Sequence, residues 1–324
     1  MKKKTAAIVI AVLLLSLVLS ACGEKDDGVY TIGISQYGEH PSLDNCRNGF
    51  LQGLTESGLK EGEDFKIIYQ NAGFDDNTTI QIAQSLISQN ADMLCAIATN
   101  SAVACFSEAE DKDIPVVFTA ITDPVEAKLD KGNVTGTSDK LPVSAQLELI
   151  RKLQPDAKTI GIIYTTSEPN SVSAIREYEK YAPDYGLTID AVGITSQAEV
   201  TQATDTLINR KVDCFSNLTD NTVVGVLASI LEKTNEANIP VYGSEIEQVK
   251  LGCVASAGID YIKLGVQTGK IAARIIKGEC KASDVPYETV EEFEIYLNEK
   301  ALSALGIDVV GADFDNAVRV TEEG

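Results

Sequence analysis

The sequence predicts an α/β protein of two Rossmann-like lobes, each built on a doubly wound parallel sheet, with a ligand cleft between them. Short β-branched segments that are apolar on both faces alternate with longer amphipathic segments, which is typical of parallel strands covered by helices. The order is repeated, because "TIGI" begins one unit at Thr31 and another at Thr159, and each unit spans about 80 residues before an Ile-Pro pair and a strand. A single sheet would need about ten parallel strands, so the repeat favours two lobes.

The first unit alternates expected strands with expected helices. The strands have the sequences "YTIGIS" (30–35), "FKIIYQ" (65–70), "MLCAIA" (93–98) and "PVVF" (115–118). The helices are expected over 43–58, 75–91 and 100–115, where apolar residues recur on one stripe. This βαβαβαβ order indicates a doubly wound sheet.

The second unit repeats the pattern, and a tail follows it. Strands are expected at "TIGIIY" (159–164), "LTIDAVGI" (187–194), "VDCFSN" (212–217) and "VYG" (241–243), separated by helices over 171–185, 197–211 and 221–240. The tail contains an amphipathic helix over 260–279, a strand near "EEFEIYLN" and a short helix, "EKALSALG". Such a tail has a place only if the chain returns to complete both lobes through several crossovers.

The first residues are expected to direct export. Lys2, Lys3 and Lys4 precede a largely apolar run that ends near Leu19, and "LSAC" ends at Cys22. The run of about fourteen residues would reach about 21 Å, short of a hydrocarbon core of about 30 Å, so it predicts a signal peptide over 1–21. "LSAC" is typical of a lipobox, in which Cys22 is lipidated and 22–28 form a tether; the alternative is an ordinary secretory signal with a chance cysteine. The mature protein is then expected at the outer face of the cytoplasmic membrane.

Charge and composition exclude several classes of function. The net charge is −21, and −24 without the three lysines of the signal, so nucleic acid would be repelled. Six cysteines follow the lipobox without a CxxC pair, and they are expected to be free and mostly buried thiols rather than disulfides. His40 is the only histidine, so we expect neither a metal site nor another cofactor, and no residue pattern pairs it with a nucleophile. The "GVQTGK" at Gly265 resembles a P-loop only superficially.

The candidate ligand site lies at the carboxyl ends of the strands, where open α/β sheets bind their ligands. Helices that begin there offer free N–H groups to a carboxylate, at Asn100 and Ser101, Asn170 and Ser171, and Asp220 and Asn221. Acidic residues in the same loops could receive an ammonium group: Asp123, Glu168, Asp220 and Glu245. Tyr37 and Tyr164 occupy corresponding places in the two units and could sandwich a ring. Together these groups describe an amino acid, although each polar residue alone is equally well an ordinary helix cap.

Several motifs together resemble a known family. "ISQYGEHPSLD", "IPVVFTAITDPV", "TIGIIYTTSEPNS", "LTDNTV" and "GVQTGKIAARIIKGE" are similar to segments of the substrate-binding lipoproteins of ABC importers, in the tryptophan-binding, TrpX-like subgroup. The resemblance covers about Val29 to Val310, and one departure is "ATNSAV", where relatives often have a Gly-Thr-Pro-like loop. It implies a type I periplasmic-binding-protein fold with three crossovers, and an aromatic amino acid held between the lobes. The positions that it implies for ligand binding are Tyr37, His40, Thr122, Asp123, Glu168, Asn170, Ser171, Thr219, Asp220 and Asn221.

The resemblance also implies a domain division and partners. The N-terminal lobe is expected to comprise 29–140 and about 257–282, and the C-terminal lobe 141–256 and about 283–310, before a tail over 311–324. The expected partners are an ABC permease with a separate ATPase and, through the lipid anchor, the membrane, and the chain is expected to be a monomer without enzymatic activity. The alternatives are a ligand sensor for a membrane receptor or an α/β enzyme.

Overall fold

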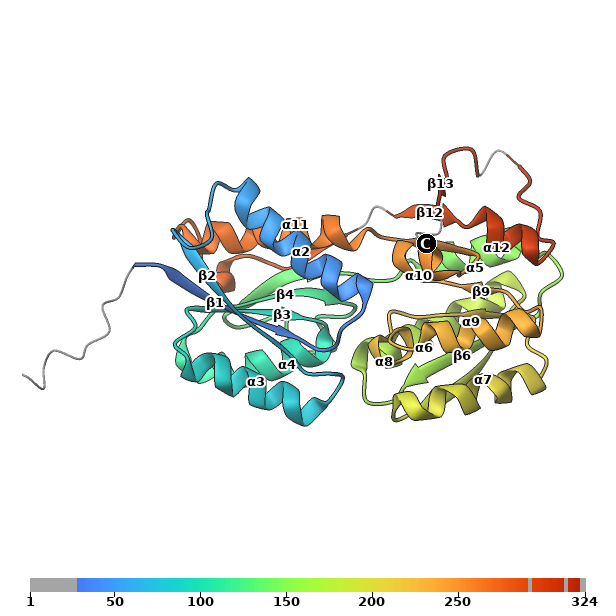
Figure 1. Ribbon diagram of the computed structural model, residues 1–324, viewed down its shortest axis with the longest axis horizontal. Helices are drawn as coiled ribbons and strands as arrows, with labels where there is room; N and C mark the ends of the chain where they lie inside the picture. Colours follow the sequence, from blue (N-terminus) through green and yellow to red (C-terminus); the bar gives the residue numbers. More distant parts are fainter. Residues whose placement is uncertain (1–27, 291–292, 312–313, 321–324) are drawn as a thin grey trace, which may run out of the picture.

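The computed structural model describes residues 28–290, 293–311 and 314–320, which form two α/β lobes side by side (Figure 1). The expected signal peptide, Cys22 and most of the tether lie outside the described residues. No helix in the described part of the chain is long and apolar enough to cross a membrane.

The first lobe is a six-stranded parallel sheet between helices, in which the four strands expected in the first unit are joined by two that the sequence analysis did not expect. The strand order is β11-β5-β4-β3-β1-β2. The strands are β1 (Tyr30–Gln36), β2 (Phe65–Asn71), β3 (Met93–Ile97), β4 (Val116–Ile121), β5 (Val134–Ser138) and β11 (Glu288–Thr289). The helices are α2 (Pro41–Glu56), α3 (Asp76–Ser88), α4 (Thr99–Ala109) and α11 (Tyr261–Ile276), with short 3-10 turns η1 (Glu110–Lys112) and η4 (Ala282–Asp284). Strands β3 and β4 are buried along their whole length, because helices cover both faces of the sheet.

The second lobe is a seven-stranded sheet in the order β13-β12-β10-β9-β8-β6-β7. Its strands are β6 (Thr159–Thr165), β7 (Thr188–Ile194), β8 (Cys214–Ser216), β9 (Val241–Tyr242), β10 (Ala255–Gly258), β12 (Glu294–Leu297) and β13 (Val318–Arg319). Its helices are α5 (Val143–Leu153), α6 (Pro169–Tyr181), α7 (Val200–Asn209), α8 (Asn221–Val224), α9 (Leu227–Glu236), α10 (Ile246–Leu251) and α12 (Glu299–Ala304), with 3-10 turns η2 (Ala182–Tyr185) and η3 (Gln197–Glu199). The single helix expected over 221–240 is divided into α8 and α9, and Gly225 lies at the break.

The chain crosses between the lobes three times. It crosses after β5, after β10 and after β11, and the last two crossovers bracket α11. The boundary expected at about 283 is too early, because β11 pairs with β5 of the first sheet. The residues expected to form a tail also include β13, which pairs with β12 of the second sheet. Both are two-residue edge strands, too short to produce a periodic signal in the sequence.

The "GVQTGK" segment lies inside α11, where its glycines allow close helix packing. A Cβ atom on Gly265 would lie 2.2 Å from the carbonyl oxygen of Cys46, and one on Gly269 would lie 2.2 Å from that of Phe50. Gly49 and Gly53 of α2 meet the α11 backbone equally closely. The motif therefore serves the contact between α2 and α11, which lie side by side in Figure 1. The six cysteines of the described part are unpaired, and all but Cys280 are buried.

Candidate functional site

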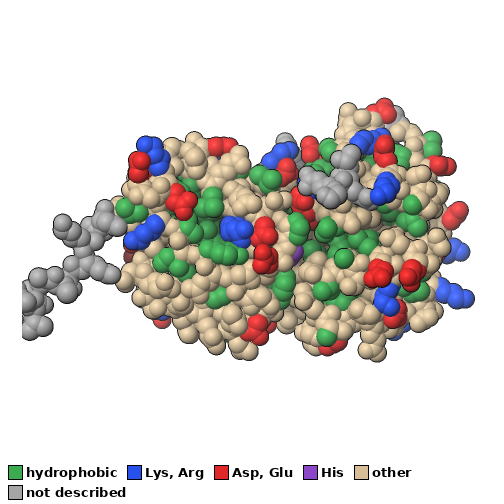
Figure 2. All heavy atoms as spheres, in the orientation of Figure 1, with side chains coloured by type: hydrophobic (Ala, Val, Ile, Leu, Met, Phe, Trp, Pro, Cys, Tyr) green, Lys and Arg blue, Asp and Glu red, His purple; other side chains and the backbone are tan. Residues whose placement is uncertain are grey.

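The loops at the carboxyl ends of the strands of both sheets meet between the lobes. Side-chain hydrogen bonds join His40 Nε2 to Asn221 Oδ1 (3.3 Å), Ser42 Oγ to Glu245 Oε1 (3.0 Å), Thr122 Oγ1 to Thr219 Oγ1 (3.3 Å) and Ser173 Oγ to Asp123 Oδ2 (3.2 Å). In the space-filling view the lobes meet along a narrow seam, with acidic side chains on both sides (Figure 2). The lobes are therefore closed on one another.

The loop after β1 contributes Tyr37 and His40, both of which are buried. The Tyr37 hydroxyl donates to Asp76 Oδ1 (3.1 Å), and burial together with the charges of Glu168 and Asp76 raises the pKa of Tyr37 well above its usual value. Burial lowers the pKa of His40 to about 4, so its ring is neutral at pH 7. His40 Nδ1 has no hydrogen-bond partner among the described residues. This loop thus presents a neutral ring and a phenol, and no cation.

Helix α4 begins without a side-chain cap. Its N-cap residue, Ala98, has a φ of +78°, a backbone conformation that costs energy for a residue with a Cβ. Thr99 Oγ1 and Asn100 Oδ1 are buried and lack a partner in the described structure, while Asn100 Nδ2 donates to Asp76 Oδ1 (2.7 Å). Ser101 Oγ accepts from Ser35 Oγ (3.4 Å). The first turn of α4 therefore offers helix N–H groups and two unsatisfied side-chain oxygens at one place.

The loop after β4 contains Thr122 and Asp123. Thr122 contacts a buried carboxylate, that of Asp139, which the sequence analysis did not identify. Thr122 Oγ1 donates to Asp139 Oδ1 (3.0 Å), and the Tyr261 hydroxyl donates to Asp139 Oδ2 (2.6 Å). Burial raises the pKa of Asp139. Asp139 directly follows β5, a strand that the sequence analysis did not expect, so its place at a strand end went unnoticed.

Glu168 of the second lobe is a fully buried carboxylate that caps a neighbouring helix. It accepts hydrogen bonds from the backbone N–H and side chain of Asn221 (2.9 and 2.8 Å) and from those of Thr222 (2.9 and 2.7 Å). Asn170 Nδ2 donates to the same carboxylate (3.1 Å), while Asn170 Oδ1 is buried without a partner in the described structure. Burial, with a smaller contribution from the charge of Asp220, raises the pKa of Glu168 to about 7.

Asp220 is also buried, and donors of its own lobe occupy both of its oxygens. The donors are Thr165 N (2.5 Å), Thr165 Oγ1 (2.8 Å), Ser171 Oγ (2.7 Å) and Val223 N (2.9 Å). Burial raises the pKa of Asp220. We expected Asp220 to receive a ligand ammonium group; with four protein donors already in place, it instead ties β6, α6 and α8 together.

Glu245 caps α10 and bonds across the seam to Ser42. It accepts from the backbone N–H groups of Glu247 (2.7 Å) and Gln248 (2.9 Å), and burial raises its pKa to about 7. Among the described residues no lysine or arginine is buried, whereas Asp139, Glu168, Asp220 and Glu245 all are. The inter-lobe region is therefore rich in carboxylates and lacks a buried cation of its own.

Tyr37 and Tyr164, which were expected to sandwich a ring, have different surroundings, and that role stays a prediction. Tyr164 is partly buried and packs against the core of its own lobe, near Gly193. Tyr37 instead makes an edge contact with Phe74 (ring centroids 6.0 Å apart), and His40 lies parallel to Phe74 (6.4 Å). Phe74 was missed because a lone phenylalanine before the helix-capping Asp75 carries no motif.

Two cavities lie between the lobes. The inner cavity, of about 10 Å³, is enclosed by residues that include His40, Asp139 and Glu245. The outer cavity, of about 320 Å³, lies between α3 and α4 of the first lobe and the β6–α6 loop of the second, with the lining residues Asp76, Thr79, Ile80, Asn100, Val103, Ala104, Ser107, Glu108, Ser167 and Pro169. The inner cavity has room for about one water molecule, whereas the outer one is in the range of small-molecule sites. In the described residues no group of three or more His, Cys, Asp or Glu side chains could hold a metal ion.

Two lobes joined by three crossovers, with polar strand-end loops closed on each other, define a type I periplasmic binding protein. A family model described as ABC transporter substrate binding protein matches residues 31–317, and the chain belongs to this family.

Relatives of known structure or name agree with this assignment. The "Tyrosine-binding protein" of Clostridioides difficile is 39% identical over 330 residues, covering 96% of this chain and 94% of the relative. A Streptococcus pneumoniae structure in complex with L-Trp has a TM-score of 0.86 at 34% identity, covering 90% of this chain and 99% of that one. A ligand-free, open substrate-binding protein from Clostridium difficile scores 0.67 at 38% identity, covering 91% and 100%. The lower score at higher identity is what the closed arrangement of the lobes predicts.

Proposed function

We propose that the chain is an extracytoplasmic, lipid-anchored receptor that binds an aromatic amino acid between its lobes and delivers it to an ABC importer. The proposal rests on two features that lie together between the lobes. Helix α4 begins there without a side-chain cap and carries unsatisfied oxygens, and buried carboxylates lie nearby without a buried lysine or arginine among the described residues. Tyrosine or tryptophan is favoured, because relatives at 39% and 34% identity are described with these ligands.

The ligand carboxylate is assigned to the first turn of α4. The backbone N–H groups there have no partner within the helix, and the helix dipole favours a negative group at this end. Thr99 Oγ1 is buried and unsatisfied beside them, and it can donate to a carboxylate oxygen. Ser101 follows in the same turn.

The ligand ammonium group is assigned to the acidic surroundings of the same site. Asn100 Oδ1 and Asn170 Oδ1 come from opposite lobes, and both are buried acceptors without a partner among the described residues. Asp123 of the first lobe and Glu245 of the second bond across the seam, while Glu168 and Asp220 are further acidic groups whose oxygens accept from protein donors. An ammonium group would supply the positive charge that the seam lacks.

The aromatic side chain is assigned to the outer cavity. Ile80, Val103, Ala104 and Pro169 give this cavity apolar walls, and its volume is adequate for a ring. Tyr37 adjoins it through the Asp76 carboxylate that it shares with Asn100. Because both lobes line the cavity, the ring would be held only when the lobes are closed.

Binding would proceed by closure of the lobes around the ligand. The ligand shifts the open–closed equilibrium to the extent that it binds the closed form better. The inter-lobe bonds of His40 to Asn221 and of Thr122 to Thr219 form only in the closed arrangement. A dissociation constant near 1 μM corresponds to about −8 kcal/mol, which a few charged hydrogen bonds and one buried ring can supply.

The proposed role in the cell, delivery of the ligand to an importer, combines the expected lipid anchor with the expected permease and ATPase. A signal peptide over 1–21 and lipidation of Cys22 would hold the monomer at the outer face of the cytoplasmic membrane, where the closed form meets a permease powered by a separate ATPase. The chain itself would act as a binding protein rather than as an enzyme, because its family is one of substrate-binding proteins and its only histidine, His40, bonds to the Asn221 amide rather than to a hydroxyl or thiol.

A thermal-shift screen of all amino acids on the protein without its lipid anchor tests the ligand class. Ligand at 100 times its dissociation constant should add about 2.7 kcal/mol of stability, so a clear rise in melting temperature is expected with L-tyrosine or L-tryptophan. No rise with L-tyrosine, L-tryptophan or L-phenylalanine would refute the aromatic assignment.

A further inference from the structure

Phe74 occupies a strained position between β2 and α3, close to the seam. Its φ is +64°, in the left-handed region that a phenylalanine rarely adopts. Its backbone N–H donates to the carbonyl oxygen of Tyr37 (2.8 Å), which ties it to the ligand-facing loop after β1. A costly backbone conformation persists only where the surroundings impose it, so the contacts of the turn and of the ring must hold Phe74 in place.

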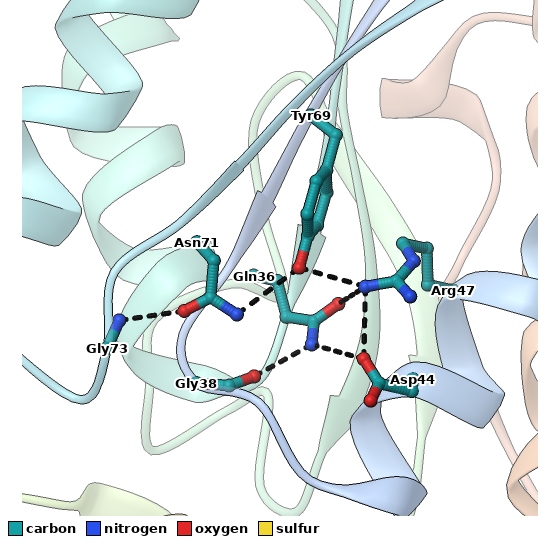
Figure 3. Close-up of polar contacts among 7 residues, drawn as sticks. All are labelled: Gln36, Gly38, Asp44, Arg47, Tyr69, Asn71 and Gly73. Carbon is teal, nitrogen blue, oxygen red and sulfur yellow. Dashed lines mark hydrogen bonds and ion pairs between the residues drawn. The ribbon is translucent and has the colours of Figure 1, made fainter.

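A polar network centred on Arg47 joins the two loops that flank Phe74 (Figure 3). Arg47 Nη1 donates to Gln36 Oε1 (2.8 Å), Asp44 Oδ1 (3.0 Å) and the Tyr69 hydroxyl (2.8 Å). The Arg47 guanidinium also lies over the Tyr69 ring, 4.6 Å from its centroid. These contacts connect the end of β1 and the start of α2 to β2.

The same network fixes the turn immediately before Phe74. Asn71 Nδ2 donates to the Tyr69 hydroxyl (3.2 Å), and Asn71 Oδ1 accepts from the backbone N–H of Gly73 (2.8 Å). On the other side, Gln36 Nε2 donates to the carbonyl oxygen of Gly38 (2.7 Å). Both the turn that precedes Phe74 and the loop beneath its ring are therefore held by side chains rather than by regular secondary structure alone.

The Phe74 ring covers the ligand-facing loop. It lies parallel to His40 and edge-on to Tyr37, and a Cβ atom on Gly38 would lie only 1.9 Å from a ring carbon. Glycine at position 38 thus leaves the space that the ring occupies.

The Phe74 ring also lies close to the second lobe, at Gly225. A Cβ atom on Gly225 would lie 3.1 Å from Phe74 Cζ, and Gly225 directly follows α8. His40, stacked against the same ring, bonds to Asn221 at the start of α8. Phe74 and His40 therefore approach one short helix of the opposite lobe together.

We propose that Phe74 is a positioning residue for ligand retention: it packs against Gly225 and holds His40 toward Asn221, so that it stabilises the closed lobes and slows ligand release. The inference rests on the proposed function, because it assigns Phe74 to the closure that traps the ligand. The Arg47 network acts through Phe74 by holding the turn that carries it.

Stopped-flow binding of L-tyrosine to Phe74→Ala tests the proposal. The dissociation rate should rise at least tenfold while the association rate changes less than threefold, because closure follows the encounter. Phe74→Tyr, which keeps the ring, should restore slow dissociation. Phe106→Ala is the matched control, since Phe106 is a partly buried phenylalanine that packs over Gly132 in the same lobe, and its dissociation rate should match the wild type. An unchanged dissociation rate in Phe74→Ala would overturn the proposal.

The contact with the second lobe is tested by Gly225→Val alone and combined with Phe74→Ala. Because a Cβ atom at position 225 would also lie 2.5 Å from Gln197 Nε2, both comparisons are made with Gln197→Ala present. In that background the valine should speed dissociation when Phe74 is intact and have at most a twofold effect once the ring is absent; equal effects with and without the ring would refute the contact. If the wild type binds neither L-tyrosine nor L-tryptophan, the proposed function fails on its own. X-ray scattering then still tests Phe74, because the radius of gyration of the ligand-free Phe74→Ala protein should exceed that of the wild type, and identical curves would contradict the role.

Discussion

The two lobes use the same strand-end positions in different ways. In the second lobe, carboxylates of these loops cap helices: Glu168 accepts hydrogen bonds from the first turn of α8, and Glu245 from the first turn of α10. In the first lobe, α2 and α4 begin without a side-chain cap, and His40 Nδ1, Thr99 Oγ1 and Asn100 Oδ1 are left unsatisfied. The uncapped start of α6 is the counterpart in the second lobe, and it leaves one such atom, Asn170 Oδ1.

The difference indicates which polar groups a ligand would complete: most of them lie at the start of α4 and in the loop after β1. Unsatisfied buried polar atoms are costly, and they persist where a ligand or another partner satisfies them. The carboxylates of the second lobe are thus largely occupied by protein donors, while the start of α4 in the first lobe keeps free N–H groups and a free hydroxyl; Asn100 Oδ1 of the first lobe and Asn170 Oδ1 of the second are free acceptors. Polar residues at strand ends predict the place of a site, but only their hydrogen-bond partners reveal which of them are free to bind.

The largest expected effect is on the stability of the second lobe. Asp220→Ala removes the acceptor of four buried hydrogen bonds, so we expect a loss of about 3–5 kcal/mol in the free energy of unfolding. Urea unfolding of the ligand-free protein measures it. Stability within about 1 kcal/mol of the wild type, together with a large loss of ligand affinity, would contradict the structural role and restore Asp220 as the ammonium partner.

A pH effect of intermediate size is expected from Glu245. Burial raises the pKa of Glu245 from 4.5 to about 7, so the folded protein binds the carboxyl proton more tightly than the unfolded chain does. The resulting contribution to the free energy of unfolding is fully present below about pH 4.5, and it is lost as the pH rises through about 7. Glu168 acts in the same direction, whereas His40, with its pKa lowered to about 4, favours folding as the pH rises toward 6.5.

Glu245→Gln isolates this contribution. Between pH 5 and pH 7.5, the wild type should lose roughly 2–3 kcal/mol more of its free energy of unfolding than the variant does. Urea unfolding at both pH values measures the difference, with Glu279→Gln, an exposed carboxylate of the first lobe, as the control. Parallel pH profiles for wild type and Glu245→Gln would show that Glu245 does not carry the shift.

A smaller effect, on binding rather than stability, is expected at the start of α4. Thr99→Val replaces an unsatisfied hydroxyl by a methyl group of similar size, so the free energy of unfolding should change little. The affinity for L-tyrosine should fall about tenfold, or roughly 1.4 kcal/mol, through loss of one donor to the ligand carboxylate. Calorimetric titration checks this, and full affinity in a stable variant would remove Thr99 from the site.

The smallest effect is expected at the edge of the seam. Ser173→Ala removes the hydrogen bond from Ser173 Oγ to Asp123 Oδ2, which joins the lobes at partly exposed positions. We expect about a twofold to threefold loss of affinity, near 0.5 kcal/mol, because water can replace the bond in the open form. A loss beyond tenfold would mean that Asp123 is a direct ligand contact whose orientation depends on Ser173.

Much of the fold could be predicted from the sequence, because buried parallel strands and amphipathic helices leave strong periodic signals. The repeat at Thr31 and Thr159 predicted two lobes, and the returning tail predicted crossovers. The short edge strands and β5 gave no such signal, and Asp139 was missed together with β5.

The meeting of the strand-end loops between the lobes was also predictable, but the hydrogen bonds among their residues were not. Glu168 and Asp220 were recognised as strand-end carboxylates, yet nothing in the sequence shows that α6 and α8 donate to them. The role of Phe74 depends on a positive φ and on contacts with residues 34 positions before it and about 150 after it, which no local pattern encodes.

The most direct test of the central claim is calorimetric titration with L-tyrosine, with tyramine, which lacks the carboxylate, and with 3-(4-hydroxyphenyl)propionate, which lacks the ammonium group. We expect L-tyrosine to bind with a dissociation constant near 1 μM or below, and loss of either charged group to weaken binding at least 100-fold, about 2.7 kcal/mol. Thr99→Val should weaken L-tyrosine binding but leave any residual tyramine binding unchanged. Binding of either analogue as tightly as L-tyrosine would contradict the assignment of an amphoteric ligand to this seam.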